Sequence, residues 1–454
     1  MLCAIGDVLR RAGSAQAPES RIESNRMAEK SPAGEGRPGT PLWRRLSAGL
    51  ITGAADDDPS GIATYSQVGA AFGYGMLWCI LLTVPLMIAI QGISAGIGRV
   101  TGQGLMDGIR KYYPNPLVYG LVVSIIFANV INLAADIGAM GAALKLLIGG
   151  PALAYTMGFA VLSLLLQIFI PFSRYSPILK ALTLSLFAYM ATVLVIHVSW
   201  GGVLKSIVVP PVTWNAKYAV GLVALLGTTI SPYLFCWQAS QEVEEMGGSS
   251  GRKPLKQAPL QAPAAFSRIG TDTTVGMVFS NLIAFFIILT AAVVLHAHGK
   301  TDIQSSADAA EALRPLAGRL AFALFAAGII GTGLLAVPVL AGATAYAAAG
   351  AFHQRAGLEH KPQRAKFFYG VLIVASLAGM ALNLTPLDPV KALYWSAVIN
   401  GVAAVPLMVV MMLMSSHRKV MGEFTTHWLL KVFGWLATAA MAAAAIVMFV
   451  TWGQ

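Results

Sequence analysis

The chain has 454 residues, of which 56% are hydrophobic and only 11% are charged, and its mean hydropathy is +0.69. Because soluble globular proteins are about one-quarter charged, this composition excludes an ordinary soluble domain and predicts an all-α polytopic membrane protein. The three cysteines lie far apart in the sequence, so they indicate neither a disulfide framework nor a thiolate metal site. The net charge of +11 is compatible with nucleic-acid binding, but its distribution along the chain has a simpler cause.

The first 42 residues are polar and rich in Pro, Gly, Ser and Arg, which predicts a disordered cytoplasmic tail. They do not follow the order of charged, apolar and small residues that is typical of a signal peptide. Met27 is a second candidate start site within this tail.

Beyond the tail, eleven apolar stretches approach the roughly 20 residues of helix that cross the hydrocarbon core. When they alternate across the membrane with the N-terminus inside, more than three quarters of the 31 lysines and arginines lie on the cytoplasmic side. This bias follows the positive-inside rule, so it predicts an external C-terminus and makes a nucleic-acid partner unnecessary. We expect the chain in a bacterial inner membrane. The stretches lie near 46–72, 75–100, 117–148, 151–172, 178–199, 217–243, 273–297, 317–350, 366–385, 389–414 and 427–451.

The stretches divide into two units of five, residues 43–200 and 217–414, followed by an appended transmembrane helix at 427–451. Because five crossings are an odd number, the second unit is inverted relative to the first, and inverted repeats are typical of secondary transporters. A stretch rich in Gly and Pro at 244–271 predicts a flexible cytoplasmic linker. Helical spacing of apolar residues predicts an external surface helix over Ser305–Leu316.

The first apolar stretch is interrupted by Asp56-Asp57-Asp58-Pro59-Ser60-Gly61. Pro59 lacks a backbone donor, so it predicts two half-helices with free backbone groups between them. Charge at membrane depth is costly and usually functional. Asp58, directly before the proline and beside open carbonyls, makes an oxygen-rich site that suits a small divalent cation. Asp57 is a candidate for the ion pathway, with the alternative that Asp56 and Asp57 cap a helix or lie near an aqueous entrance.

A second break, Gly227–Tyr233, opens the second unit. The carbonyls of Thr228 and Thr229, left free by Pro232, are candidate metal ligands, either directly or through water. Ser231 adds a hydroxyl to this oxygen-only set, with the alternative that the hydroxyls bond back to the previous helical turn. Paired interruptions in corresponding halves are the sequence feature that best indicates a transporter's substrate site.

Other polar residues lie near the breaks. Gln238 and Glu242 share a helix face and are candidates to line an inward vestibule. Asp136 in the third stretch is a candidate for a proton or ion path, with the alternative that it is a buried acid hydrogen-bonded to a neighbouring amide or backbone group. Asn281 and Asn400 are more typical of hydrogen bonds between helices than of metal ligands.

The sequence contains no nucleophile–base pair, phosphate-binding loop or nucleotide motif that indicates catalysis. We therefore expect no enzymatic activity and no bound cofactor. The expected partners are membrane lipid and a divalent metal cation as transported substrate, and no protein partner is indicated.

These motifs resemble those of the Nramp family of divalent-metal transporters over nearly the whole chain, and most closely its branch of Nramp-related magnesium transporters. The resemblance implies the inverted five-plus-five architecture, with broken helices 1 and 6 and a cation site between them. It is carried by Asp58-Pro59-Ser60-Gly61, Phe72-Gly73-Tyr74-Gly75, Val100-Thr101-Gly102-Gln103, Asp136 and Ser231-Pro232-Tyr233.

This chain also departs from the pattern of typical family members. Gly61 takes the place of a ligand asparagine, Ser231 that of a ligand methionine and Tyr233 that of a histidine, while Thr228 falls where the family's carbonyl ligand lies. Ala139 replaces an acid tied to proton movement. The metal positions implied by the resemblance, together with the break residues, are Asp58, Gly61, Thr228 and Ser231; Tyr233 is assigned to the possible ion pathway.

These replacements bear on the transported cation. Loss of the thioether removes the ligand that favours softer metals, and a site with fewer side-chain ligands suits Mg²⁺, which retains water. We therefore expect a secondary transporter of Mg²⁺, Mn²⁺ or both, without obligatory proton coupling. The alternatives are a proton-coupled manganese or iron importer and an organic-solute symporter of the same fold.

Overall fold

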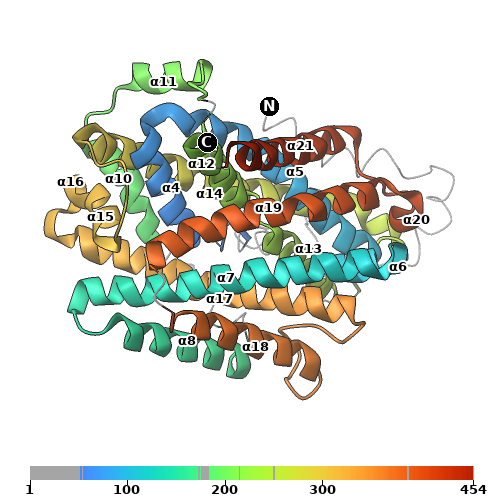
Figure 1. Ribbon diagram of the computed structural model, residues 1–454. Coiled ribbons are helices and arrows are strands. Elements are labelled where there is room, and N and C mark those ends of the chain that lie inside the picture. The colour runs from blue at the N-terminus through green and yellow to red at the C-terminus, as the bar shows by residue number, and fades with distance from the viewer. Residues whose placement is uncertain are drawn as a thin grey trace.

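The computed structural model describes residues 52–53, 55–171, 174, 184–213, 215–248, 251–385 and 388–452. Throughout these ranges the regular elements are helices, with no strand (Figure 1), which confirms the predicted all-α fold. The predicted disordered tail, residues 1–42, lies outside the described residues.

The helices alternate with short turns along the chain. The predicted surface helix over Ser305–Leu316 is present as α15 and α16, joined by a 3₁₀ turn. The helices are α4 (Pro59–Phe72), α5 (Leu77–Thr101), α6 (Leu105–Tyr112), α7 (Asn115–Ile148), α8 (Ala152–Phe169), α10 (Phe187–Val195), α11 (Trp200–Val208), α12 (Ala216–Thr229), α13 (Pro232–Gly248), α14 (Ala262–Val294), α15 (Ser306–Ala310), α16 (Arg314–Ala317), α17 (Ala321–Ala351), α18 (Lys366–Leu382), α19 (Pro389–Ser416), α20 (Arg418–Met421) and α21 (Trp428–Thr451).

Eight helices of the described chain are long and apolar enough to cross a membrane, or nine if a bent pair counts as one. The predicted number was eleven, although each predicted stretch contains a helix. The two numbers differ because α4 continues into α5 through a 3₁₀ turn, Gly73–Met76, and the two count as one stretch. In addition, α18 has only 17 residues and is not among the eight. Finally, Leu184–Val195 meets Trp200–Val208 at an angle of 113°, and this bent pair is the possible ninth.

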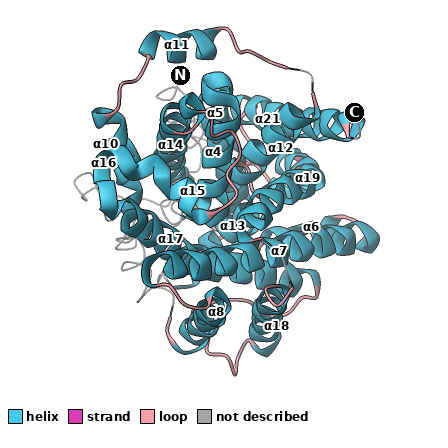
Figure 2. Cartoon of the chain, turned by 60° about the vertical axis from the view of Figure 1, so that its left-hand side comes forward, coloured by secondary structure: helices cyan, strands magenta, loops and turns pink. Residues whose placement is uncertain are grey.

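The helices form one bundle with α4 inside it. Helix α4 packs against α14, α19 and α12, and Figure 2 shows it enclosed among these helices. Helices α8 and α18 lie on the outer side of α7 and α17 in both views. The start of α4 is therefore far from the surface, which makes the break before it a buried place.

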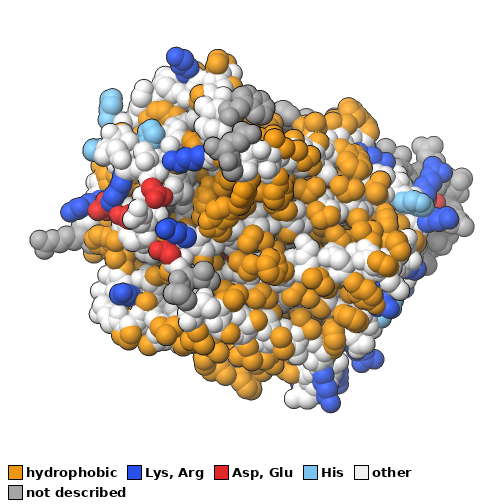
Figure 3. All heavy atoms as spheres, viewed as in Figure 1, with side chains coloured by type: hydrophobic (Ala, Val, Ile, Leu, Met, Phe, Trp, Pro, Cys, Tyr) orange, Lys and Arg blue, Asp and Glu red, His pale blue; other side chains and the backbone are white. Residues whose placement is uncertain are grey.

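The surface of the molecule has the character of a membrane protein. Figure 3 shows a broad hydrophobic band, with charged side chains gathered at the two ends of the molecule. One end includes α6 and α20, which contribute the basic side chains of Arg110, Lys111, Arg418 and Lys419. The band can face the hydrocarbon core of a membrane, because the backbone N–H and C=O groups beneath it form their hydrogen bonds within helices.

The connector predicted at 244–271 is shorter than expected, because α13 continues to Gly248 and α14 begins at Ala262. The connector is also held in place by a hydrogen bond to another helix. The buried guanidinium of Arg99, at the end of α5, donates a hydrogen bond to the carbonyl of Lys253 at 2.6 Å. The connector thus satisfies a buried charge and is held against α5.

Candidate functional site

The first break has the predicted form. Residues 55–56 are helical, Asp57 and Asp58 are not, and α4 starts at Pro59. Asp58 is extended and caps α4: its Oδ1 accepts hydrogen bonds from the Gly61 amide at 2.7 Å and the Ser60 hydroxyl at 2.6 Å. Aspartate is a favoured N-cap, and a proline in the first turn costs no hydrogen bond. The local sequence therefore fixes both the break and the direction of the Asp58 carboxylate.

The second oxygen of Asp58 joins the break to other helices. Asp58 Oδ2 accepts a hydrogen bond from Asn132 Nδ2 of α7 at 3.1 Å and lies 3.4 Å from the Tyr233 hydroxyl of α13. The Tyr233 hydroxyl also lies 3.1 Å from the carbonyl oxygen of Ala55, and Asn132 Oδ1 accepts from the Ser396 hydroxyl of α19 at 2.7 Å. Asp58 is 1% exposed, so neutral donors from three helices hold a buried carboxylate.

The two preceding aspartates turn away toward α14. The Ser280 hydroxyl donates to Asp56 Oδ2 at 2.5 Å and lies 3.3 Å from Asp57 Oδ1. Both side chains are buried, because the backbone of Gly53 packs directly on that of Gly276 and closes this side. The alternative that these aspartates lie near an aqueous entrance is therefore wrong for this conformation.

At the second break, the side-chain hydroxyls form hydrogen bonds to backbone carbonyls of the preceding helical turn. Helix α12 ends at Thr229 and α13 begins at Pro232. The Ser231 hydroxyl donates to the Gly227 carbonyl at 2.7 Å and lies 3.0 Å from the Thr228 carbonyl, and the Thr229 hydroxyl bonds back in the same way. Pro232 has no amide for the Thr228 carbonyl, so a side-chain hydroxyl takes that role. The back-bonding alternative is confirmed for Ser231 and Thr229.

The two breaks meet beside Gly61. A β-carbon built on Gly61 would lie 3.1 Å from the carbonyl oxygen of Asp56, 3.3 Å from the Thr228 hydroxyl and 3.4 Å from a ring carbon of Tyr65. The structure thus brings together the metal positions predicted on separate halves of the chain. Tyr65 was not among the predicted residues, although it lies one helical turn after Gly61 on the same face.

Asp136 lies on α7 one turn beyond Asn132 and is fully buried. Neither oxygen of its carboxyl group has a hydrogen-bond partner among the described residues. Asn132 turns to the first break instead, and Asn129 donates to the Thr344 hydroxyl at 2.9 Å. The alternative that Asp136 is hydrogen-bonded to a neighbouring amide or backbone group is therefore wrong for the described residues, and its buried carboxyl group lies within electrostatic reach of Asp58.

Gln238 and Glu242 share a face of α13, but neither lines an open vestibule in this structure. Gln238 Oε1 accepts a hydrogen bond from the Thr52 hydroxyl before the first break. Glu242 forms an ion pair with Nη2 of Arg268 on α14. Nη1 of the same guanidinium lies 3.0 Å from Oε2 of Glu245. Both side chains are buried, and each bonds α13 to another segment of the bundle.

The hydrogen-bond partners of the Asp58 carboxylate are amides and hydroxyls. Within the described part of the chain, no three His, Cys, Asp or Glu side chains form a metal-ligand cluster. No lysine, arginine or histidine of that part forms an ion pair with Asp58 at the 4.0 Å limit. Three further buried carboxyl groups, those of Asp56, Asp57 and Asp136, lie within electrostatic reach of Asp58. Oxygen donors of this kind suit a hard cation rather than a soft one.

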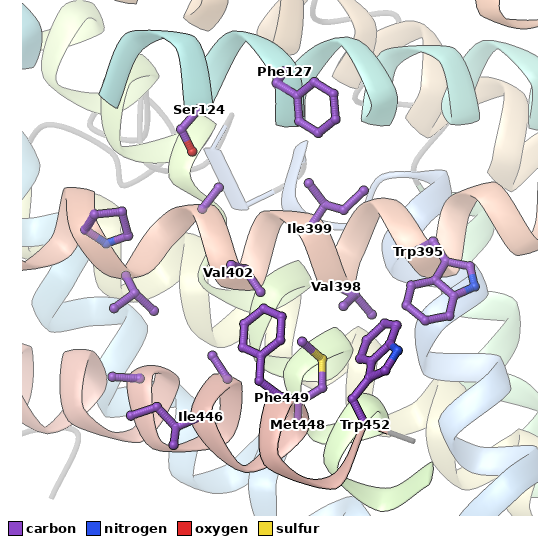
Figure 4. Close-up of a pocket in the computed structure, with 15 residues that line it drawn as sticks. Ser124, Phe127, Trp395, Val398, Ile399, Val402, Ile446, Met448, Phe449 and Trp452 are labelled. Atoms are coloured by element: carbon purple, nitrogen blue, oxygen red, sulfur yellow. The ribbon is translucent and has the colours of Figure 1, made fainter. Parts of the chain in front are cut away.

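A separate cavity of about 700 Å³ lies between α7, α19 and α21 (Figure 4). Its lining is almost entirely apolar and includes Phe127, Trp395, Phe449 and Trp452. No residue of either break lines it. This cavity offers no ligands to a cation and is distinct from the candidate site.

A helical bundle with paired helix breaks is the arrangement in which inverted-repeat membrane transporters build their substrate sites. A family model described as natural resistance-associated macrophage protein-like, Nramp, matches residues 49–451. The chain belongs to the Nramp family. This membership confirms the predicted family and the prediction that the protein is a membrane transporter and not an enzyme.

Individual relatives show the same likeness. The chain is 25% identical over 398 residues to the divalent metal cation transporter MntH of Klebsiella pneumoniae (strain 342). The aligned residues cover 85% of this chain and 89% of the relative. A crystal structure of the Eremococcus coleocola manganese transporter matches with a TM-score of 0.69 at 17% identity, over 94% of this chain and 90% of the other. A structure of MhsT in complex with L-phenylalanine matches with a TM-score of 0.55 at 14% identity, over 89% and 97% of the two chains. The structural matches show a shared fold.

Proposed function

We propose that this chain is a secondary transporter that carries divalent metal cations across the membrane, with Asp58 as the principal ligand of the transported cation. The observation that carries the proposal is the buried Asp58 carboxylate, held by neutral donors at the meeting point of the two breaks. A buried carboxylate is costly unless a positive charge accompanies it, and the substrate cation supplies that charge. The similarity to a curated divalent metal cation transporter supports the same substrate class.

The cation binds between the breaks in this proposal. Asp58 gives the charged oxygen, while Thr228 and Ser231 give neutral oxygens at the end of α12. Gly61 contributes no side-chain ligand, and its neighbours leave no room for one without a shift of backbone or side chains. A cation with so few protein ligands keeps water in its remaining positions. Because Mg²⁺ dehydrates reluctantly, we favour Mg²⁺ as the main substrate and Mn²⁺ as a second one.

Proton coupling is not obligatory in this proposal. Tyr233 stands in the site as a hydrogen-bonded phenol, and phenols titrate near pH 10 in water, so they do not take up protons near neutral pH. Ala139 offers no acid. Two charges gain about 4.6 kcal/mol per 100 mV of inside-negative potential, at about 2.3 per charge, so the cation needs no proton to drive its entry.

The same proposal includes an orientation. The basic end of the molecule around α6 and α20 is cytoplasmic, because positive residues are retained on that side. The N-terminus is then cytoplasmic, the C-terminus external, and the membrane the inner membrane of a bacterium.

The second candidate function is a proton-coupled manganese or iron importer. It is favoured by Asp136, a buried acid of α7 whose two carboxyl oxygens have no hydrogen-bond partner among the described residues, so the acid is available to take up a proton. An organic-solute symporter is less favourable. Three consecutive aspartates at the first break repel an anionic substrate, whereas such symporters direct half-helix N-termini at one.

Uptake into proteoliposomes tests these functions together. Purified protein is reconstituted under a fixed inside-negative potential, and Mg²⁺, Mn²⁺ and Ca²⁺ uptake is followed together with internal pH. We expect Mg²⁺ uptake without acidification. Folded wild-type protein that moves none of these cations contradicts the proposed function. Metal-dependent acidification at a fixed ratio, lost in Asp136→Asn, would establish the proton-coupled candidate instead.

A further inference from the structure

Asn400 of α19 is a buried amide whose polar atoms are not paired. It is 1% exposed, and neither Oδ1 nor Nδ2 forms a hydrogen bond with any residue of the described ranges. Asn281 of α14 is a matched comparison: it is 2% exposed, accepts from the Thr83 hydroxyl at 2.9 Å and donates to the Met277 carbonyl at 2.9 Å. The prediction that both amides bond helices together therefore holds for Asn281 and is wrong for Asn400.

An unpaired buried amide destabilises a fold, because both of its polar ends have lost water without gaining a partner. A leucine of similar size would remove that penalty. The amide at this position therefore has both polar ends available to water or to a ligand that passes through the bundle.

The neighbours of Asn400 connect it to the first break. Ser396 lies one helical turn earlier on the same face of α19, and its hydroxyl donates to Asn132. Asn132 in turn donates to Asp58. Four residues of helix correspond to about 6 Å along the axis, so Asn400 lies about one turn from the level of the Asp58 network.

The next residue connects α19 to the second break. A β-carbon built on Gly227 would lie 2.7 Å from the α-carbon of Gly401, so the two backbones are in direct contact. Gly227 immediately precedes Thr228, a predicted metal position. Asn400 is thus flanked on α19 by one residue bonded into the Asp58 network and by another that packs on the second break.

Gln91 of α5 is another buried amide with neither end paired in the described ranges. Its neighbour Ser94 donates to the Phe235 carbonyl of α13 at 2.6 Å, which does not lead to Asp58. Asn400 is therefore the one of these two amides whose neighbours reach both breaks.

We propose that Asn400 is a further binding residue for the transported cation, whose amide oxygen receives the cation as it leaves Asp58 toward the basic end of the molecule. Residue numbers in α19 rise toward α20 and that end, so Asn400 lies on the exit side of Asp58 for an importer. An amide oxygen is a neutral, hard ligand for Mg²⁺ or Mn²⁺. A neutral second position allows release, since conduction requires binding that is weak enough to leave. The inference rests on the proposed function.

The experiment combines two readouts on Asn400→Leu and on the control Asn281→Leu. We expect Asn400→Leu to keep or raise the melting temperature of the purified protein, and to raise the KM for Mg²⁺ uptake about tenfold, as for a lost contact to a charged group. Asn281→Leu should do the opposite: a lower melting temperature and an unchanged KM in the protein that remains folded.

Two further variants keep the test decisive if Asn400→Leu does not fold. Asn400→Asp adds a charge and should lower the KM for Mg²⁺, whereas Asn400→Gln retains an amide oxygen and should stay within about threefold of wild type. A wild-type KM in folded Asn400→Leu or Asn400→Asp overturns this inference alone. Wild-type vesicles without divalent uptake overturn the proposed function, and this inference falls with it.

Discussion

The two breaks solve the same backbone problem in different ways. Before α4, a charged side chain bonds the free backbone groups: the Asp58 carboxylate caps the helix and also contacts two other helices. At the end of α12, neutral hydroxyls bond the free backbone groups, and the Ser231 hydroxyl contacts the carbonyls of Gly227 and Thr228. The difference places the charge of the site on one half of the chain and only neutral oxygens on the other. Binding strength should therefore depend on the first break, and the choice among cations on both.

The largest effect is expected from removing the charge of the first break. Asp58→Asn should reduce divalent-cation uptake by at least about a hundredfold, because loss of a charged partner in a buried site costs about 3–5 kcal/mol. Asparagine is as good an N-cap as aspartate, so α4 should start as before. Uptake is measured in proteoliposomes, and folding by melting temperature and gel filtration. A well-folded variant that transports at the wild-type rate would contradict the role of Asp58.

A change of both breaks at once should shift selectivity. Gly61→Asn combined with Ser231→Met adds an amide and a thioether, which favour partly dehydrated and softer ions, so the Mg²⁺-to-Mn²⁺ uptake ratio should fall about tenfold. The new side chain at 61 must displace neighbours, since the Asp56 carbonyl lies 3.1 Å from its first carbon. Gly61→Ala is the matched control: it meets the same crowding without a ligand and should leave the ratio unchanged. An unaltered ratio in a folded double variant would show that these positions do not set selectivity.

The contact between the breaks should have a moderate effect. Tyr233→Phe removes the hydroxyl that lies 3.1 Å from the Ala55 carbonyl and 3.4 Å from Asp58. One hydrogen bond is worth about 1 kcal/mol, so the KM for Mg²⁺ should rise about fivefold. The dependence of uptake on pH should stay that of the wild type, because a phenol does not titrate near pH 7. A change in the pH profile would assign Tyr233 to a proton path.

The smallest effect is expected at the second break alone. Ser231→Ala leaves the carbonyls of Gly227 and Thr228 without their hydroxyl donor and should lower the free energy of unfolding by about 1 kcal/mol. Uptake should stay within about threefold of wild type, because no charge is lost, the Thr228 oxygens remain as neutral ligands, and water can replace a hydroxyl that is already bonded to two carbonyls. If Ser231→Ala were as damaging to uptake as Asp58→Asn, the two breaks would not divide the work as described.

The sequence was most informative where the cause is local. Pro59 and Pro232 break their helices whatever surrounds them, so both interruptions could be predicted from single stretches of chain. The apolar stretches likewise predicted the all-α fold, and the short motifs at the breaks indicated the family. The number of crossing helices was less predictable, because the turn at Gly73–Met76 continues one helix into the next and residues 184–208 bend.

The partners of the site residues were the part that sequence could not supply. The Ser280 hydroxyl donates a hydrogen bond to Asp56, more than 200 residues away in the sequence. Asn132 donates to Asp58 and not to Asp136. Such choices depend on how whole helices pack. Asn400 was misjudged for the same reason, since its type and setting resemble those of Asn281, and only the packed structure shows that one is paired and the other is not.

The most direct test of the account is the number of charges moved per Mg²⁺. Flux and current are measured together in proteoliposomes of known potential, for wild type and Asp58→Asn. The account predicts two positive charges per Mg²⁺ in the wild type, no change of this ratio between pH 6 and 8, and neither flux nor current above background in Asp58→Asn. A ratio of three or more charges per Mg²⁺ together with acidification of the vesicles, or full flux in Asp58→Asn, would contradict it.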